Sequence, residues 1–184
     1  MEDPSLISSQ KVYQSRVFSL YRETFEKAGR VVEVDVVRHR GAVAVLPILG
    51  EQLILENQFR YSISSRVLEV PAGTLERGES VYECAKRELA EETGYVAEKL
   101  IRMGQIAVSP GYDDEKITLF VAWLRQGERK SQQLDEDEVI QVLQMSKEEV
   151  LRKIRQGEIF DAKTVAAVLL AKELGYLRGP LATR

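Results

Sequence analysis

The stretch from Gly73 to Tyr95, GTLERGESVYECAKRELAEETGY, predicts a loop that leads into a single helix. Ser80 is placed to cap the start of this helix, where the preceding Glu79 complements the helix dipole. Gly94 predicts its end, because the left-handed conformation that follows a last turn favours a residue without Cβ. Between these ends, apolar residues four apart predict the buried side of the helix: Val81, Ala85 and Leu89.

A second face of this helix is acidic. Glu88 and Glu92 lie four residues apart, so their side chains stack on one face, with Glu91 close by. Like charges at this spacing repel, but a hard divalent cation prefers several carboxylate and carbonyl oxygens and would turn the repulsion into binding. Arg87, four residues before Glu91, can pair with it. A solvated surface is the alternative, because glutamate is a good helix former and charge runs are usually exposed.

The same stretch resembles the Nudix box, G-x5-E-x7-R-E-U-x-E-E-x-G-U, in which U is a bulky aliphatic or similar residue. Tyr95 departs slightly from this pattern, since the last U position is more usually aliphatic. So many matches at fixed spacing favour metal-assisted pyrophosphate chemistry over a plain surface helix. The matching residues are Gly73, Glu79, Arg87, Glu88, Leu89, Glu91, Glu92 and Gly94.

Composition describes an ordinary globular protein. The 184 residues, 44% hydrophobic and 30% charged, suit one domain with at most a small accessory element. A net charge of −3 argues against a general nucleic-acid binder, but leaves nucleotide substrates open. With Cys84 and His39 the only residues of their types, a disulfide framework, a thiolate cluster and a Ser-His-Asp triad have little to build on. Without a signal peptide or membrane-length apolar run, we expect a cytoplasmic protein without membrane contact.

The N-terminal part predicts an antiparallel β-meander. Apolar residues recur between Lys11 and Arg38, and Ala28-Gly29 separates two runs as a hairpin turn. We therefore predict two parts, residues 1–40 as a meander and residues 41–184 as the main domain, and the family resemblance given below implies dimerisation and substrate binding for the first part and catalysis for the second. The alternative is that the meander only extends the sheet of a single domain.

The remainder predicts alternating strands and helices. Residues 41–49 and 52–58 form an apolar hairpin around Gly50-Glu51, typical of strands covered on both faces. Three more strands are expected at 100–108, 117–124 and 139–145. Helices are expected at 146–156, with Ser146 in a capping box, and at 162–174, with Asp161 as the N-cap.

Beyond the box, the chain resembles one Nudix subfamily, the ADP-ribose pyrophosphatases. Pro110, sixteen residues after Gly94, is at the position typical of this subfamily. GDP-mannose and other nucleoside-diphosphate-sugar pyrophosphatases are near relatives of this group. The resemblance covers nearly the whole chain, through QFRY (58–61), EVPAGTLERGE (69–79), SPGYDDE (109–115), DEDE (135–138) and FDAKT (160–164).

The resemblance implies an α/β (α+β) Nudix fold, in which a mixed β-sheet lies between helices and an N-terminal antiparallel meander precedes it. It also implies two or three Mg2+ or Mn2+ ions, which suit an all-oxygen ligand set better than zinc does. The implied ligands are the Ala72 carbonyl, Glu88, Glu92 and Glu138. Arg87 would orient Glu91.

For catalysis, the resemblance implies Glu136 as the general base, with Glu115 as its rival. Arg60 and Ser109 would contact the phosphates or the terminal ribose. The residues expected near the adenine are Glu69, Phe18 and Asp35, with Phe18 contributed by the second subunit of a homodimer that pairs through the N-terminal strands.

The function that this resemblance implies is metal-dependent hydrolysis of ADP-ribose to AMP and ribose 5-phosphate. The alternatives are a pyrophosphatase for another nucleoside-diphosphate sugar, such as GDP-mannose, and a non-catalytic ADP-ribose sensor. A structural or interaction protein whose acidic helix is only surface is a further alternative.

Overall fold

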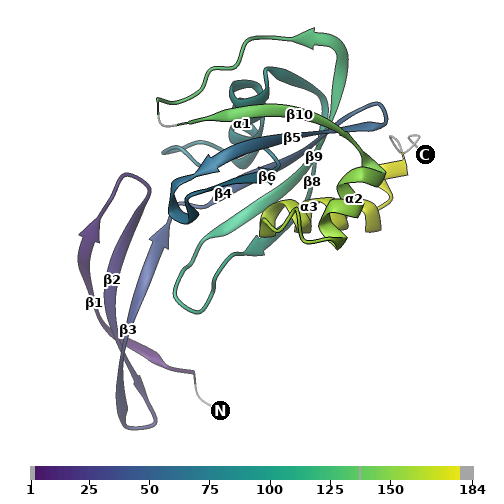
Figure 1. Ribbon diagram of the computed structural model, residues 1–184. Helices are drawn as coiled ribbons and strands as arrows, with labels where there is room; N and C mark the ends of the chain where they lie inside the picture. The colour runs from purple at the N-terminus through teal and green to yellow at the C-terminus, as the bar shows by residue number, and fades with distance from the viewer. Residues whose placement is uncertain (1–2, 137, 179–184) are drawn as a thin grey trace. The chain divides into compact units, whose positions relative to one another are not determined.

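The computed structural model describes residues 3–136 and 138–178 (Figure 1). The chain divides into two compact units, Met1–Gly41 with Ala107–Lys116, and Ala42–Ile106 with Ile117–Arg184. The first unit thus includes a segment from the middle of the chain that a division at residue 40 leaves out. No helix in the described ranges has the length and apolar character needed to cross a membrane.

The first unit is a three-stranded antiparallel sheet with the order β1-β2-β3. Ala28 and Gly29 both have positive φ, 51° and 76°, as expected for a tight two-residue hairpin turn. The loop 107–116 is bound to this sheet, since the Val37 N–H donates to the Tyr112 carbonyl at 2.7 Å. The predicted meander is therefore present, as β1 (Ser5–Gln14), β2 (Phe18–Lys27) and β3 (Arg30–His39).

The second unit contains a mixed seven-stranded sheet in its described part. Its main path has the order β10-β5-β4-β9-β8, with β6 paired to β5 and β7 paired to β4. Strands β4 and β9 run parallel, while β5 is antiparallel to β4, β6 and β10. The strands are β4 (Ala42–Leu49), β5 (Gln52–Arg60), β6 (Ser65–Glu69), β7 (Ala72–Thr74), β8 (Tyr95–Ala107), β9 (Lys116–Arg129) and β10 (Ile140–Ser146).

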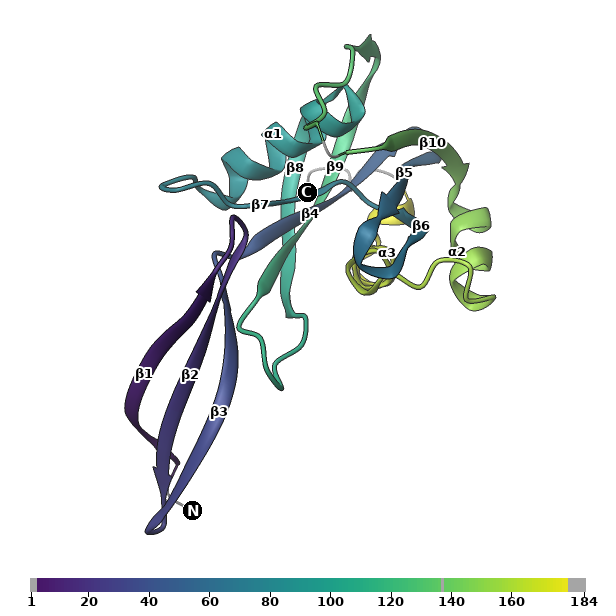
Figure 2. The same ribbon diagram turned by 60° about the vertical axis from the view of Figure 1, so that its left-hand side comes forward.

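Helices cover both faces of this sheet (Figure 2). Helix α1 (Val81–Thr93) packs on one face, and α2 (Lys147–Arg155) and α3 (Ala162–Glu173) pack on the other. Strand β4 alternates between the two, because successive side chains of a strand point to opposite faces. Val43 and Val45 contact the α1 side, whereas Ala44 and Leu46 contact the α3 side. The predicted mixed sheet between helices is confirmed.

Strand limits differ from the prediction mainly around β8. The strand begins at Tyr95, directly after the turn at Gly94, and not at residue 100. Tyr95 is only 5% exposed and packs in the core beneath α1, and Gln144 donates a hydrogen bond to its hydroxyl at 2.9 Å. The burial of this aromatic side chain accounts for the earlier start of the strand.

Candidate active site

Helix α1 has the predicted ends. Ser80 accepts a hydrogen bond from the Glu83 N–H, and the Glu83 carboxylate accepts one from the Ser80 N–H, which completes a capping box. Gly94 closes the helix in the left-handed region, with φ of 74°. These local signals fix where the helix begins and ends, whereas the packing of Ala85 and Leu89 in the core decides which glutamates face the sheet.

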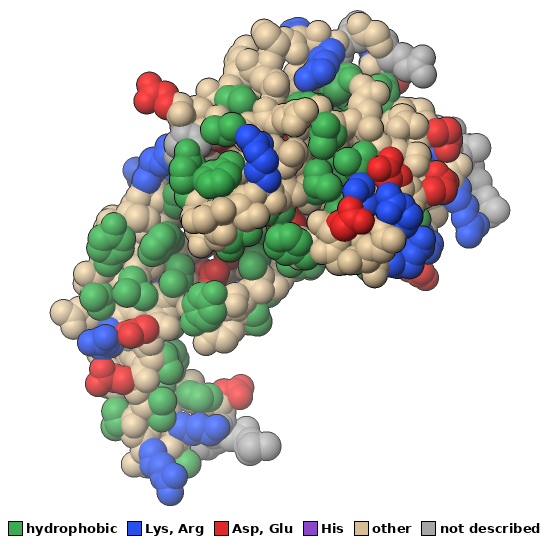
Figure 3. Space-filling model, viewed as in Figure 1, with side chains coloured by type: hydrophobic (Ala, Val, Ile, Leu, Met, Phe, Trp, Pro, Cys, Tyr) green, Lys and Arg blue, Asp and Glu red, His purple; other side chains and the backbone are tan. Residues whose placement is uncertain are grey.

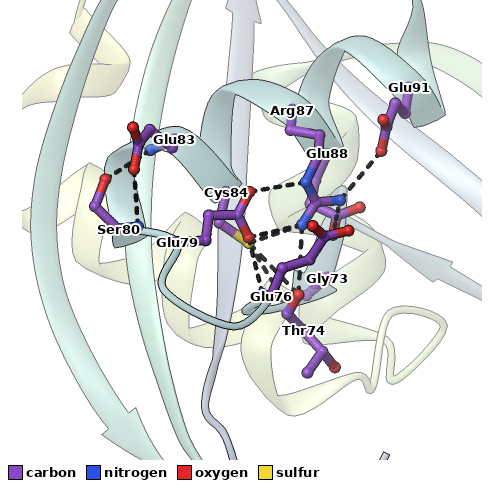
Figure 4. A network of polar contacts seen from close by, with 10 residues as sticks. All are labelled: Gly73, Thr74, Glu76, Glu79, Ser80, Glu83, Cys84, Arg87, Glu88 and Glu91. Atoms are coloured by element: carbon purple, nitrogen blue, oxygen red, sulfur yellow. Dashed lines mark hydrogen bonds and ion pairs between the residues drawn. The ribbon is translucent and has the colours of Figure 1, made fainter. Parts of the chain in front are cut away.

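Arg87 binds three carboxylates at once (Figure 4). Its Nε and Nη2 donate to the two oxygens of Glu79 at 2.8 and 3.0 Å, and Nη1 donates to Glu88 at 2.7 Å and Glu91 at 3.1 Å. The bond from Arg87 holds the pKa of Glu79 at about 2, well below its ordinary value. The expected pair with Glu91 is therefore one part of a larger network that also orients Glu79 and Glu88.

Gly73 leaves the space that the Glu88 carboxylate occupies. A Cβ added at Gly73 would lie 1.8 Å from Glu88 Oε1 and 1.9 Å from its Cδ. Burial raises the pKa of Glu88 to about 7, against the opposing effect of Arg87, and the negative charges of Glu91 and Glu138 raise it further. The carboxylate is thus confined beside a backbone that has no side chain.

Glu92 lies one turn further along α1 and is 3% exposed. Its Oε2 accepts a hydrogen bond from the Ala72 N–H at 2.9 Å, which joins the helix to the start of β7. Burial raises the pKa of Glu92 well above its ordinary value, and the charges of Glu56, Glu88 and Glu138 act in the same direction. Four carboxylates therefore influence one another in this region.

Glu56, a buried acid on β5 that is 1% exposed, was not predicted from the sequence. Because side chains alternate along a strand, Glu56 and Gln58 share the face of Ile54, which packs in the same cluster as α1. Burial raises the pKa of Glu56 to about 8, and the charges of Glu69 and Glu138 add to this effect. The signal was present in the run QLILENQ, where a strand covered on both faces has to bury its glutamate.

Arg60 and Glu69 form a bidentate ion pair between the ends of β5 and β6. Nε and Nη2 of Arg60 donate to the two Glu69 oxygens at 2.8 and 2.7 Å. Lys163, from the first turn of α3, also donates to Glu69 and bonds Asp161 at 3.0 Å. Glu69 is thus held by two cations, and Arg60 has N–H groups that these two bonds do not use.

The acidic loop before β10 closes on itself. The Asp135 N–H donates to the Glu138 carboxylate at 3.0 Å, and the Glu138 N–H donates to the Asp135 carbonyl at the same distance. Glu138 influences the pKa values of Glu88 and Glu92, whereas Glu136 is exposed. Asp137 lies outside the described residues.

The remaining predicted residues belong to the first unit. Phe18, at the start of β2, contacts the Tyr13 ring with centroids 6.2 Å apart. Asp35 accepts hydrogen bonds from Arg22 at 3.0 and 3.3 Å, which lowers its pKa. The Ser109 carbonyl accepts hydrogen bonds from the N–H groups of Tyr112 and Asp113 in its loop, at 3.1 and 3.0 Å. The Glu115 carboxylate lies 3.4 Å from His39 Nδ1. Their roles toward a substrate stay predictions.

The donor set of the second unit fits a hard divalent cation. Within residues 3–136 and 138–178, no three acidic, histidine or cysteine side chains already converge to hold an ion. The ligand types are nevertheless suitable, since the buried groups are carboxylates and an ion of this class prefers oxygen. Moreover, Oε1 of Glu56 is buried without a hydrogen-bond partner in the described chain. A bound cation would supply positive charge beside this atom.

Comparisons with known proteins establish the family of the chain. The model of the NUDIX domain family matches residues 38–168, so the chain belongs to the NUDIX family. An ADP-ribose pyrophosphatase of Bacillus subtilis (strain 168) is 37% identical over 164 residues, which cover 88% of this chain and 89% of that protein. A methanol dehydrogenase activator of Bacillus methanolicus is similar to the same extent, with 37% identity and the same coverage.

A solved structure extends the similarity to the whole fold. A crystal structure of an ADP compounds hydrolase superimposes with a TM-score of 0.81 and 27% sequence identity, and the match covers 98% of both chains. Both units of the present chain therefore have counterparts in that protein.

Proposed function

We propose that this protein hydrolyses the diphosphate of ADP-ribose, in a metal-dependent reaction, to AMP and ribose 5-phosphate. The observation that carries the proposal is the set of buried glutamates, Glu88 and Glu92, gathered against Ala72 and Gly73 in a chain that is 37% identical to an ADP-ribose pyrophosphatase. A surface helix would leave these carboxylates in water, and burying them carries a cost that a bound cation offsets.

The residues that would hold the metal are the Ala72 carbonyl, Glu88, Glu92 and Glu138. A bound Mg2+ or Mn2+ supplies charge neutralisation for the diphosphate and lowers the pKa of a bound water. Two or three ions are part of this proposal. Arg87 acts on one of these ligands through its bond to Glu88, whose rotamer it restricts before substrate binds, and it also orients the neighbouring Glu91.

The chain's own acids would move the proton. Glu136, exposed in the acidic loop, would accept the proton of the attacking water as general base. Glu115, in the loop between β8 and β9, is the rival for this role. A comparison of Glu136→Gln with Glu115→Gln decides between them, because only loss of the base removes the acidic limb of the pH–kcat profile.

Further residues would contact the substrate. Arg60 would bind a phosphate through the N–H groups that Glu69 leaves available, and Ser109 would contact the phosphates or the terminal ribose. Glu69, Asp35 and Phe18 would lie near the adenine, with Phe18 supplied by a second subunit.

We further propose a homodimer, in which residues 1–40 serve dimerisation and substrate binding and residues 41–184 form the catalytic domain. Support comes from the first unit, where β1 is exposed along its whole length and hydrophobic side chains lie on the surface (Figure 3). Two-fold pairing would cover these side chains, which include Leu6, Ile7, Val12, Tyr13, Val31 and Val32.

A cytoplasmic location is also part of the proposal and is tested by cell fractionation.

Another nucleoside diphosphate compound is the second candidate substrate. The similar solved structure is that of an ADP compounds hydrolase, so an ADP compound other than ADP-ribose is an alternative within the same chemistry.

The testing experiment is a hydrolysis panel with ADP-ribose, GDP-mannose, NADH and diadenosine polyphosphates, each with Mg2+, with Mn2+ and with EDTA. We expect metal-dependent release of AMP, fastest from ADP-ribose. Glu92→Gln is expected to lower kcat by roughly a hundredfold or more and to change KM little, whereas Glu98→Gln, an exposed acid on β8, keeps wild-type rates. Faster cleavage of another compound would replace the substrate, and binding without cleavage would indicate a sensor.

A further inference from the structure

The buried acid Glu56 lies beside a second carboxylate, Glu69, which takes the hydrogen bonds of the nearby cations Arg60 and Lys163. The charges of these cations also act on Glu56, against those of Glu69 and Glu138. The direct partner of Glu56 across β5 and β6 is Glu69, so the two carboxylates lie on one face of adjacent strands. Glu69 is balanced by Arg60 and Lys163, which bond both of its oxygens. In contrast, Glu56 Oε1 has no hydrogen-bond partner within the described residues, and the residue opposite Glu56 on β10 is the apolar Val142. The local arrangement therefore neutralises one acid of the pair more fully than the other.

Two unpartnered oxygens lie next to each other on this strand. In the described residues, only three buried side-chain polar atoms lack a hydrogen-bond partner, and two of them are Glu56 Oε1 and Gln58 Oε1. Glu56 and Gln58 are two positions apart on β5 and share the face toward α1. Buried polar groups almost always have a hydrogen-bond partner. Two neighbouring oxygen atoms without a donor therefore indicate a ligand that donates a hydrogen bond or carries positive charge.

The same face carries the ligands of the proposed metal centre. Glu92 lies on the buried side of α1, and the charges of Glu56 and Glu92 act on each other. Glu138 acts on both of them from the acidic loop. Carboxylate and amide carbonyl oxygens together form the type of ligand set that Mg2+ and Mn2+ accept.

We propose that Glu56 supplies a further carboxylate ligand to a divalent cation held with Glu92 and Glu138, and that the Gln58 side-chain carbonyl stabilises the same ion. The proposal rests on the metal site of the proposed function and extends it inward from the box to strand β5. It assigns a role in binding the ion to a residue outside the Gly73–Tyr95 stretch.

The test measures Mn2+ binding to the full-length protein without substrate. The two methods are calorimetry and electron paramagnetic resonance of free Mn2+. Glu56→Gln keeps the size of the side chain and removes its charge, and it should fold, because burial disfavours the charged form of Glu56. We expect it to lose one Mn2+ ion or to weaken its binding by roughly tenfold to a hundredfold. Glu56→Leu removes both oxygens and should show the same loss, which keeps the test valid if one variant does not fold.

Glu98→Gln is the matched control, since it removes the same charge from an exposed position of the same unit. Wild-type stoichiometry and affinity in both Glu56 variants would overturn the proposal and would make Glu56 a buried acid without a ligand. Failure of the proposed function is distinguishable. In that case ADP-ribose is not cleaved, but the Mn2+ titration still differs between wild type and Glu56→Gln.

Discussion

Gly73→Ala tests whether Gly73 is needed for the space that the Glu88 carboxylate occupies or for its own backbone conformation. Its φ lies outside the left-handed region, so alanine adds no backbone strain there, but the new Cβ would lie 1.8 Å from Glu88 Oε1. That atom is the end of a flexible side chain, so we expect the carboxylate to move away. Its departure breaks the 2.7 Å bond from Arg87, and charge-assisted bonds of this kind contribute roughly 1.5–3 kcal/mol.

The expected loss of stability is small. Replacing glycine by alanine stabilises the protein by about 0.4–1 kcal/mol, because it lowers the conformational entropy of the unfolded chain. Arg87 also keeps its bonds to Glu79 and Glu91. The net change is about 1–2 kcal/mol, or roughly 2–8 °C in the unfolding midpoint. Activity should suffer far more, with kcat lower by roughly a hundredfold, because a ligand displaced by about 1 Å has such an effect.

Gly78→Ala is the control with the opposite geometry. Gly78 has φ of +85°, and no atom lies within 4 Å of a Cβ added there, so alanine costs about 1–2 kcal/mol of backbone strain without touching Glu88. Denaturant unfolding should show similar losses for both variants, while Mn2+ titration and kcat should be impaired only in Gly73→Ala. Wild-type Mn2+ affinity and kcat in Gly73→Ala would refute this reasoning.

Three further predictions concern the same helix. Arg87→Lys cannot bind Glu79 through two donors while reaching Glu91, so we expect a loss of roughly 1–3 kcal/mol and a lower kcat, measured by denaturant unfolding and AMP release. In EDTA, the unfolded chain ionises Glu88 from about pH 4.5 upward, whereas the folded chain ionises it only near pH 7, so this residue alone should lower the free energy of unfolding by about 3 kcal/mol as pH rises through that window. Glu88→Gln should reduce the fall by that amount and keep the part that Glu56 and Glu92 contribute, and an unchanged profile in this variant would contradict the raised pKa of Glu88. Ser80→Ala should lower stability by about 1 kcal/mol and leave Mn2+ affinity unchanged, and a change in affinity would argue against a purely structural cap.

Sequence reasoning succeeded where the determining signal was local. The ends of α1 depend on Ser80 and Gly94, and the first hairpin depends on Ala28-Gly29, and the structure confirms all three. The start of β8 was placed too late, because the burial of Tyr95 depends on residues far along the chain. Helix and turn signals act within a few residues, whereas strand limits depend on partners.

The acids outside the box show the same distinction. Glu56 was missed because the apolar character of its strand concealed which face each side chain takes. The binding of Arg60 by Glu69 requires the β5–β6 register, and the approach of Lys163 to Glu69 joins residues separated by 94 positions. No local pattern in the sequence specifies such a contact.

The sequence by itself determined the family, the caps of the catalytic helix and the identity of its acidic residues, since all of these follow from residue types at fixed spacing. Only the tertiary structure decided the environment of those acids. It placed Glu88 against Gly73, Glu92 under the Ala72 N–H, and Glu56 on the same face of the sheet as α1. The physical reason is that burial, and with it the affinity for protons and cations, is created by packing between elements that are distant in the chain.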